Sequence, residues 1–371
     1  MSNSRENRIA ILTFQGAENS GASLQAYALQ EKIKELGFAE EVVHLNYINE
    51  KIASRNKVLA QGSLKQAVAL LLKKVIYMRR INLRREKFAT FDTEHLKLTS
   101  PLTKKNIAEK TREFGTFIVG SDQVFNTEIT GHDETYLLDF TDDSQAARFG
   151  YATSFGDVRY FNQNIDYFRS AFERFDNLTF REKDAADAVE NTLGGRYEVV
   201  VDPTMLHDRN FWLDRFPEIQ NRPIDKEYLL IYAVNPGEKM LPFAKKYASD
   251  NNLEIVYLNT GLRSVPGVIN IFAFGPVEFL KFINNATATL VTSFHGLVFS
   301  TIFEKQFAVE LLEKQSAGQA RLTSLMNRLE IQDRDISKND NPFSNEIDYD
   351  QVQLKLQESR DASLNVIREW W

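Results

Sequence analysis

The sequence predicts an α/β fold made of two Rossmann-like αβα domains, each built around a parallel sheet. Three observations lead to this prediction. Short β-branched runs alternate with amphipathic stretches, an alternation that is typical of βαβ units. The pattern restarts near residue 227. The chain of 371 residues is also longer than one ordinary domain.

The first βαβ unit is predicted from residue 8 onward. Residues 8–14 read as a strand, and the apolar positions of 23–38 share one helical face, with Gly37 as the expected C-cap. Residues 40–47 read as the next strand. A strand, a helix and a parallel strand in this order predict a right-handed crossover.

The rest of the first half is expected to continue the alternation. A cationic helix is predicted at 63–90. The strand before Arg181 is followed by a helix that ends at two glycines. The expected strands lie within 114–126, 147–156, 177–180 and 197–207, the last of them stopped by Asp202-Pro203.

From residue 227 a second set of elements is predicted. Strands are expected at 227–235, 253–260, 287–293 and 306–312, and helices at 239–252, 275–286 and 295–305. The domains are therefore expected to be 1–215 and 216–345, with the boundary segment at 206–226. Residues 346–371 are expected to form a helix that crosses back to the first domain.

Composition narrows the class of protein. With 43% hydrophobic and 26% charged residues, the chain has the make-up of a soluble globular protein. The net charge of 45 − 51 = −6 argues against nucleic-acid binding. Without cysteine there is no disulfide, cysteine nucleophile or thiolate metal site.

A cytoplasmic location is expected, because neither a signal peptide nor a membrane-spanning stretch is visible in the sequence. The basic stretch at 64–87 leaves open peripheral contact with anionic lipid headgroups. The alternative is a partly buried helix with a solvated basic face. The oligomeric state cannot be predicted.

Polar residues recur where the predicted strands end, which is where parallel sheets bind ligands. They are Asn19 to Gly21, Ser121 to Gln123, Ser154, Arg181, and Ser293 to Gly296. Each alone is equally explained as a turn residue. Their recurrence at the same end of successive strands favours a shared site.

Three side chains have a chemical reason to belong to that site. His295 lies at a strand-to-helix junction, where its ring suits general acid–base chemistry, although a core histidine is the alternative. Arg181 suits bidentate capture of a phosphate or carboxylate; the alternative is an ion pair with Glu182 or Asp184. Arg321 is a further cation, or a solvated charge. No metal-ligand cluster, P-loop or GxSxG motif is present.

Six segments together resemble the polysaccharide pyruvyl transferase family. They are "NSGASLQAYALQ" (19–30), "FIVGSDQVFN" (117–126), "YATSFG" (151–156), "REKDA" (181–185), "VVDPTML" (200–206) and "VTSFHGLVFSTIF" (291–303). The resemblance implies a GT-B-like fold, in which two Rossmann-like domains face a cleft. It also implies transfer of the enolpyruvyl group of phosphoenolpyruvate onto two hydroxyls of a sugar, giving a pyruvate ketal in surface or capsular polysaccharide biosynthesis.

The resemblance also assigns roles to residues. It implies that His295 is the acid–base residue and that Arg181 binds the anionic donor. Arg321, Ser293 and Gly296 are further expected donor contacts. Ser293 stands where many members carry arginine, so Arg263 or Arg321 is expected to substitute.

Asn19, Gln25, Asp122, Gln123 and Ser154 are expected on the acceptor side. No metal and no cofactor beyond the co-substrate phosphoenolpyruvate is implied. The other partner would be a sugar acceptor, for which a lipid-diphosphate carrier is attractive. The alternatives are a GT-B glycosyltransferase that uses a nucleotide sugar and a catalytically silent glycan-binding relative.

Overall fold

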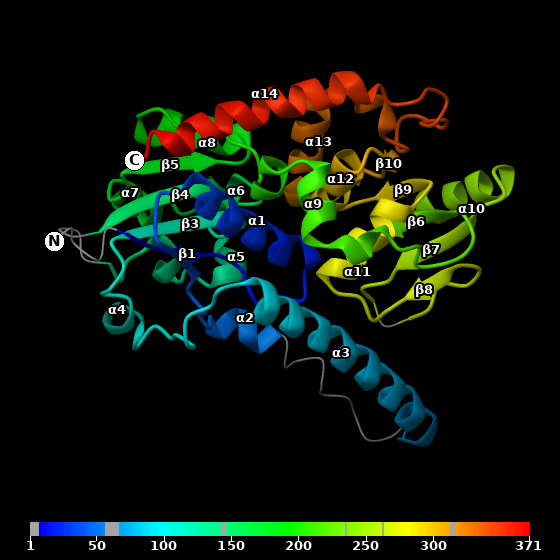
Figure 1. Cartoon of the computed structure of the whole chain (residues 1–371), viewed down its shortest axis with the longest axis horizontal. Helices are drawn as coiled ribbons and strands as arrows, with labels where there is room; N and C mark the ends of the chain where they lie inside the picture. The colour runs from blue at the N-terminus through cyan, green and yellow to red at the C-terminus, as the bar shows by residue number, and fades with distance from the viewer. Residues whose placement is uncertain (1–6, 56–66, 142–145, 234–235, 262, 312–315) are drawn as a thin grey trace.

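The chain folds around two five-stranded parallel sheets (Figure 1). The structure is a computed structural model that describes residues 7–55, 67–141, 146–233, 236–261, 263–311 and 316–371, with side chains to residue 53 in the first range, from 78 in the second and from 320 in the last. The predicted α/β fold class with two parallel sheets is confirmed.

The first sheet has the strand order β2-β1-β3-β4-β5. Its strands are β1 (Arg8–Leu12), β2 (Glu41–His44), β3 (Thr116–Asp122), β4 (Ala147–Thr153) and β5 (Asn177–Phe180). The order reverses between β1 and β3, and such a switch point is where doubly wound sheets bind ligands.

The second sheet has the order β10-β9-β6-β7-β8. Its strands are β6 (Tyr228–Tyr232), β7 (Glu254–Leu258), β8 (Ile269–Ile271), β9 (Ala288–Val291) and β10 (Gln306–Val309). Here the switch point lies between β6 and β9. All the strand pairs are parallel, so the carboxyl ends of the strands share one edge of each sheet.

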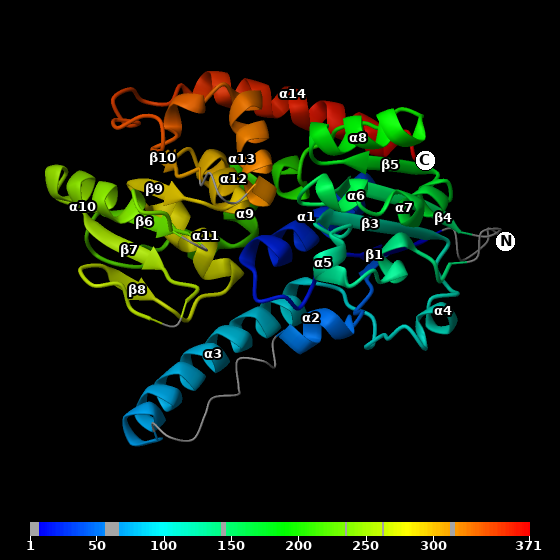
Figure 2. The ribbon, with the colours of Figure 1, turned by 180° about the vertical axis from the view of Figure 1, so that it is seen from behind.

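Helices cover both faces of the sheets (Figure 2). The α-helices are α1 (Ser20–Leu36), α2 (Glu50–Arg55), α3 (Ala67–His95), α4 (Ile107–Lys110), α5 (Thr127–Thr130), α6 (Arg159–Asn162), α7 (Ile165–Phe172), α8 (Lys183–Leu193), α9 (Arg209–Arg215), α10 (Met240–Asp250), α11 (Pro276–Asn285), α12 (Phe294–Ile302), α13 (Ser316–Leu329) and α14 (Tyr349–Arg368). Short 3-10 turns are η2 (Glu134–Leu137), η3 (Pro203–Leu206), η4 (Pro217–Gln220) and η5 (Gln332–Arg334).

Helix α1 shows why the sequence folds as predicted. The Asn19 side chain caps its start by accepting from the Gly21 and Ala22 amides, and Gly37 ends it in the left-handed region at φ 72°. The helix is buried along most of its length, because it packs between the two halves of the molecule.

The strand predicted at 197–207 is wrong. Only Val199 bridges to Phe180, and the chain then turns into η3. The apolar run here is buried at the junction of the two halves rather than in a sheet: the Val201 amide donates to Ser363 of α14 at 3.0 Å. The short edge strand β8 was not predicted, because its three residues are half-buried or exposed and carry little pattern.

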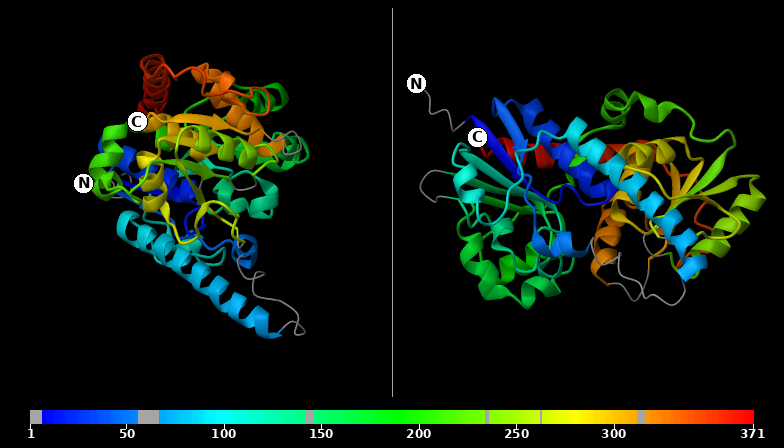
Figure 3. Two further views of the ribbon diagram at one scale, coloured as in Figure 1. Left: turned by 90° about the vertical axis from the view of Figure 1, so that its right-hand side faces the viewer. Right: turned by 90° about the horizontal axis from the view of Figure 1, so that it is seen from below.

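Two helices connect the halves (Figure 3). Helix α14 runs from the second sheet to the first, where Arg360 donates to the Met205 carbonyl at 2.9 Å and Trp370 stacks on Phe149 with centroids 4.5 Å apart. The limits proposed for the domains, 1–215 and 216–345, stay a prediction.

Helix α3 is the second connection, and basic residues of its second half contact the rest of the protein. Arg84 donates to the Glu18 carbonyl at 2.7 Å and to the Thr260 carbonyl at 3.3 Å, and Lys87 pairs with Glu278. This contradicts a simply solvated basic face for residues 80–87; residues 64–66 lie outside the described chain. No described helix has the length and apolar character that a membrane span needs.

Candidate active site

His295 lies at the start of α12, at the switch point of the second sheet. Ser293 is the N-cap of this helix and accepts from the Gly296 amide at 3.0 Å, which sets the position of the next turn. A side chain at Gly296 would meet Ser293 and Tyr232. Ser293 and Gly296 therefore shape the loop that holds the histidine.

Asp202 is the residue that joins the two predicted catalytic groups. Its carboxylate is 0% exposed, and its Oδ2 lies 2.9 Å from Arg181 Nη1 and 3.5 Å from His295 Nε2. Ser121 and Thr204 also donate to this carboxylate, at 3.2 and 2.7 Å. From the sequence, Asp202 is predicted only to end a strand, although it lies in the "VVDPTML" segment of the family resemblance.

The charges of this cluster are strongly coupled. Burial acts to raise the pKa of Asp202, but His295 and Arg181 outweigh it and hold that pKa well below its ordinary value. Burial also acts against the charge of Arg181, yet Glu182, Asp202 and Asp122 raise the pKa of its guanidinium. Both groups are therefore ionised across the neutral range.

Arg181 follows β5 and is buried. It forms the ion pair with Glu182 that the sequence offers as an alternative, with Arg181 Nε 2.9 Å from Glu182 Oε1, but this pair lies inside the protein. Arg321, from α13, lies 3.8 Å from Asp122. Burial and the nearby Arg181 lower the pKa of Arg321. The Phe294 ring stacks against both guanidiniums, at 4.7 and 6.0 Å.

Three buried nitrogens of this cluster make no close hydrogen bond with the described residues, although two of them face carboxylates. They are His295 Nε2, 3.5 Å from Asp202, Arg181 Nη2, 3.6 Å from Asp122, and Arg321 Nε. A buried donor without an acceptor costs about 1–3 kcal/mol. Buried nitrogens gathered in this way can bind an anion.

The amino end of α1 approaches the other side of the histidine ring. A Cβ atom at Gly21 would lie only 2.0 Å from His295 Nδ1. Glycine is therefore required here by close packing of the first half of the chain on the second. Ser20 and Ser23 of the same turn have buried hydroxyls without a partner in the described structure.

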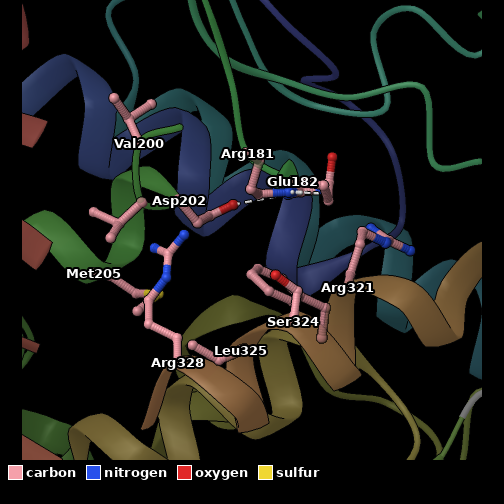
Figure 4. A pocket seen from close by; sticks show the side chains of 11 residues that line it. Arg181, Glu182, Val200, Asp202, Met205, Arg321, Ser324, Leu325 and Arg328 are labelled. Carbon is pink, nitrogen blue, oxygen red and sulfur yellow. Dashed lines mark hydrogen bonds and ion pairs between the residues drawn. The ribbon is translucent and has the colours of Figure 1, made fainter. Parts of the chain in front are cut away.

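A small cavity of about 20 Å³ opens beside Asp202, room for about one water (Figure 4). Arg181 and Glu182 lie on one side of it, and Arg328 reaches toward Asp202 from α13. Arg328 has no ion-pair partner among the described side chains, and burial lowers its pKa. Arg328 could not be predicted as a site residue, because it belongs to no motif of the sequence.

A larger cavity of about 200 Å³ lies at the switch point of the first sheet. Asn19, Asp122 and Gln123 line it, so three of the five expected acceptor residues meet there. Asp122 has φ 68°, in the left-handed region, which turns its carboxylate between this cavity and the arginines.

The other two expected acceptor residues are bonded inside the protein. Gln25 donates to Thr13 at 2.8 Å and accepts from the Ser121 amide at 3.2 Å. Ser154 accepts from the Gly156 amide at 2.9 Å. Neither is among the described residues that line the large cavity. Arg263 is exposed in the loop after β7 and is not brought to the cluster.

The two parallel α/β units meet at a buried histidine, arginines and carboxylates. The protein is therefore an α/β protein whose polar site is assembled from both halves of the chain. The model of the family named polysaccharide pyruvyl transferase matches residues 19–309. The chain belongs to this family.

Solved structures of low sequence identity are similar to this chain over most of its length. UDP-GlcNAc 2-epimerase of Neisseria meningitidis, bound to UDP-GlcNAc, is 10% identical over 96% of this chain and 99% of its own, with a TM-score of 0.47. The Methanocaldococcus jannaschii UDP-GlcNAc 2-epimerase is 11% identical over 98% and 99%, with a TM-score of 0.48. The Escherichia coli heptosyltransferase WaaC with ADP is 9% identical over 84% and 90%, with a TM-score of 0.39. No curated protein sequence matches the chain.

Proposed function

We propose that this protein transfers the enolpyruvyl group of phosphoenolpyruvate to two hydroxyls of a sugar, forming a pyruvate ketal for a cell-surface polysaccharide. Membership of the pyruvyl transferase family supports the donor and the class of acceptor. The observation that carries the proposal is the cluster of buried nitrogens on His295, Arg181 and Arg321 that make no close hydrogen bond with the described residues. The donor molecule has a phosphate and a carboxylate that would satisfy them.

The proposed reaction begins with proton delivery to C3 of the donor. His295, which lies 3.5 Å from the buried Asp202 carboxylate, would supply this proton, while C2 takes up the oxygen of the first sugar hydroxyl. The proton lost by that hydroxyl would return to the imidazole. The carbon-carbon double bond is then gone, and C2 holds both the phosphate and the sugar oxygen.

In the second step the other sugar hydroxyl attacks C2 and the bond from C2 to the phosphate oxygen breaks. The hydroxyl proton leaves with inorganic phosphate, so atoms and charges balance. Arg181 and Arg321 would offset the charge that gathers on the departing phosphate. Asp202 would hold the histidine ring in place as a positioning residue.

Purified protein, phosphoenolpyruvate and a panel of acceptors test the proposal. We expect release of inorganic phosphate together with a gain in acceptor mass, both abolished by His295→Asn with little change in the thermal melt. Comparing free glycosides with lipid-diphosphate-linked glycans would identify the carrier. Release of UDP from a sugar nucleotide without phosphate release would instead support a glycosyltransferase, and no turnover of either kind would support a glycan-binding protein.

A further inference from the structure

The cavity of about 200 Å³ has a composition that selects its ligand. Of its described lining residues, Asp122 alone carries a formal charge. The remainder are apolar or aromatic side chains, with amides and hydroxyls between them. They include Phe14, Gln15, Asn19, Tyr47, Gln123 and Tyr136. No cation is among the described lining residues, so an anionic ligand would have no counter-charge in the wall of this cavity, whereas a neutral one needs none.

Several of the polar groups are not used within the protein. The Gln15 side-chain oxygen is buried without a donor, while its nitrogen bonds to the Leu45 carbonyl. Tyr136 has no hydrogen-bond partner for its hydroxyl among the described residues. Asn19 and Gln123 use their side-chain oxygens, as a helix cap and as the acceptor for Asn126 at 2.9 Å, so their NH₂ groups remain as donors.

Tyr136 is held rigidly at this cavity. Its ring packs edge-on against Phe14 and Tyr47, with centroids 5.4 and 5.9 Å away. Burial and the nearby Asp133 raise the pKa of the Tyr136 hydroxyl, so it remains a donor. Phe14 adds an aromatic wall against which the apolar face of a ring can rest.

We propose that this cavity binds one neutral pyranose of the acceptor, with Tyr136 and Gln15 as specificity-determining residues and Asp122 facing the hydroxyls that react. The inference rests on the proposed function, which it extends to the class of acceptor sugar. The volume lies below the roughly 300–1,000 Å³ of pockets that enclose drug-sized ligands, so one ring is enclosed and any further sugars lie outside. Asp122 stands 3.6 Å from Arg181 and 3.8 Å from Arg321, which places the pyranose next to the proposed donor site.

Binding of model glycosides to the full chain tests the inference without turnover. The probes are neutral methyl hexopyranosides and the matching methyl hexuronides, followed by ligand-observed NMR in the absence of phosphoenolpyruvate. We expect saturable binding of a neutral glycoside and at least tenfold weaker binding of its uronide. Tyr136→Phe should weaken neutral binding roughly 3- to 10-fold, the loss of one hydrogen bond.

A matched control is Tyr197→Phe, which removes a hydroxyl from a residue outside the described lining. It should leave binding unchanged, and Gln15→Met should weaken it as Tyr136→Phe does. In turnover assays Tyr136→Phe should raise KM for the acceptor and leave KM for phosphoenolpyruvate unchanged. Equal binding of the uronide, or unchanged binding by Tyr136→Phe, overturns the inference even if phosphate is released. Selective binding without any phosphate release upholds the inference while the proposed function fails.

Discussion

Replacing Gly21 by alanine tests whether the amino end of α1 positions His295. The new Cβ would lie 2.0 Å from His295 Nδ1 and 2.3 Å from its Cγ. Carbon atoms in contact normally stand about 3.5–4.0 Å apart, so the ring or the helix has to move by about 1.5 Å. A shift of about 1 Å at a reacting group costs on the order of 100-fold in rate. We therefore expect kcat to fall about 100-fold or more, measured by phosphate release.

The stability effect distinguishes this clash from a general defect. Overpacking costs about 1–3 kcal/mol, and urea denaturation would measure it. In the His295→Ala background the ring is absent, so Gly21→Ala should cost close to nothing there. A double-mutant cycle would then give a coupling of about 1 kcal/mol or more. Rates within a few-fold of wild type, or the same stability cost in both backgrounds, would refute the reasoning.

Three further perturbations follow from the buried charges. Asp202→Asn removes a buried carboxylate with a depressed pKa, so we expect the free energy of unfolding at neutral pH, measured by urea denaturation, to fall by about 3–5 kcal/mol. The difference from wild type should shrink as the pH falls below about 4, where the unfolded carboxylate is protonated. An equal difference at pH 3 and pH 7 would contradict this. Burial lowers the pKa of His44 to about 4 in the folded protein. Below about pH 6.5 this histidine therefore binds more protons in the unfolded protein than in the folded one, and the free energy of unfolding should fall from there toward pH 4. The variant His44→Gln should flatten that slope, and an unchanged slope would exclude this histidine as its source. Arg84→Ala should lower the free energy of unfolding by about 1–3 kcal/mol in the same assay, because it leaves the Glu18 and Thr260 carbonyls without this donor. Lys87 is more exposed, so Lys87→Ala should lower it by at most about 1 kcal/mol. Equal losses of stability would show that α3 does not connect the halves in this way.

Much of the fold could be predicted because each strand–helix unit carries its own local pattern. The stretch from Ser20 to Gly37 combines a cap, an apolar face and a left-handed terminator, and it forms the expected helix. The apolar run 197–207 misled the prediction, because burial between two halves of a protein gives the same composition as burial in a sheet.

The candidate site could be predicted only in part. The turn positions of His295 and Arg181 could be read from the chain, since both directly follow strands. Which of the polar residues would meet could not be predicted. Asp202 joins Arg181 of the first half to His295 of the second, and this contact depends on how the two halves pack. Ser154 also follows a strand but forms its bond inside the protein, a distinction that depends on side-chain direction rather than on sequence position.

Helix α14 has a consequence for the order in which the molecule is made. Ser363 accepts from the Val201 amide, and Trp370 covers Phe149. In both pairs the whole second sheet, β6 to β10, lies between the two partners in the sequence. During vectorial synthesis the first sheet therefore leaves the ribosome with an aromatic surface that is not yet covered. Contacts so distant in sequence form slowly, and exposed apolar surface aggregates. Nascent chains that stop before α14 should consequently depend on chaperones more than the finished protein does.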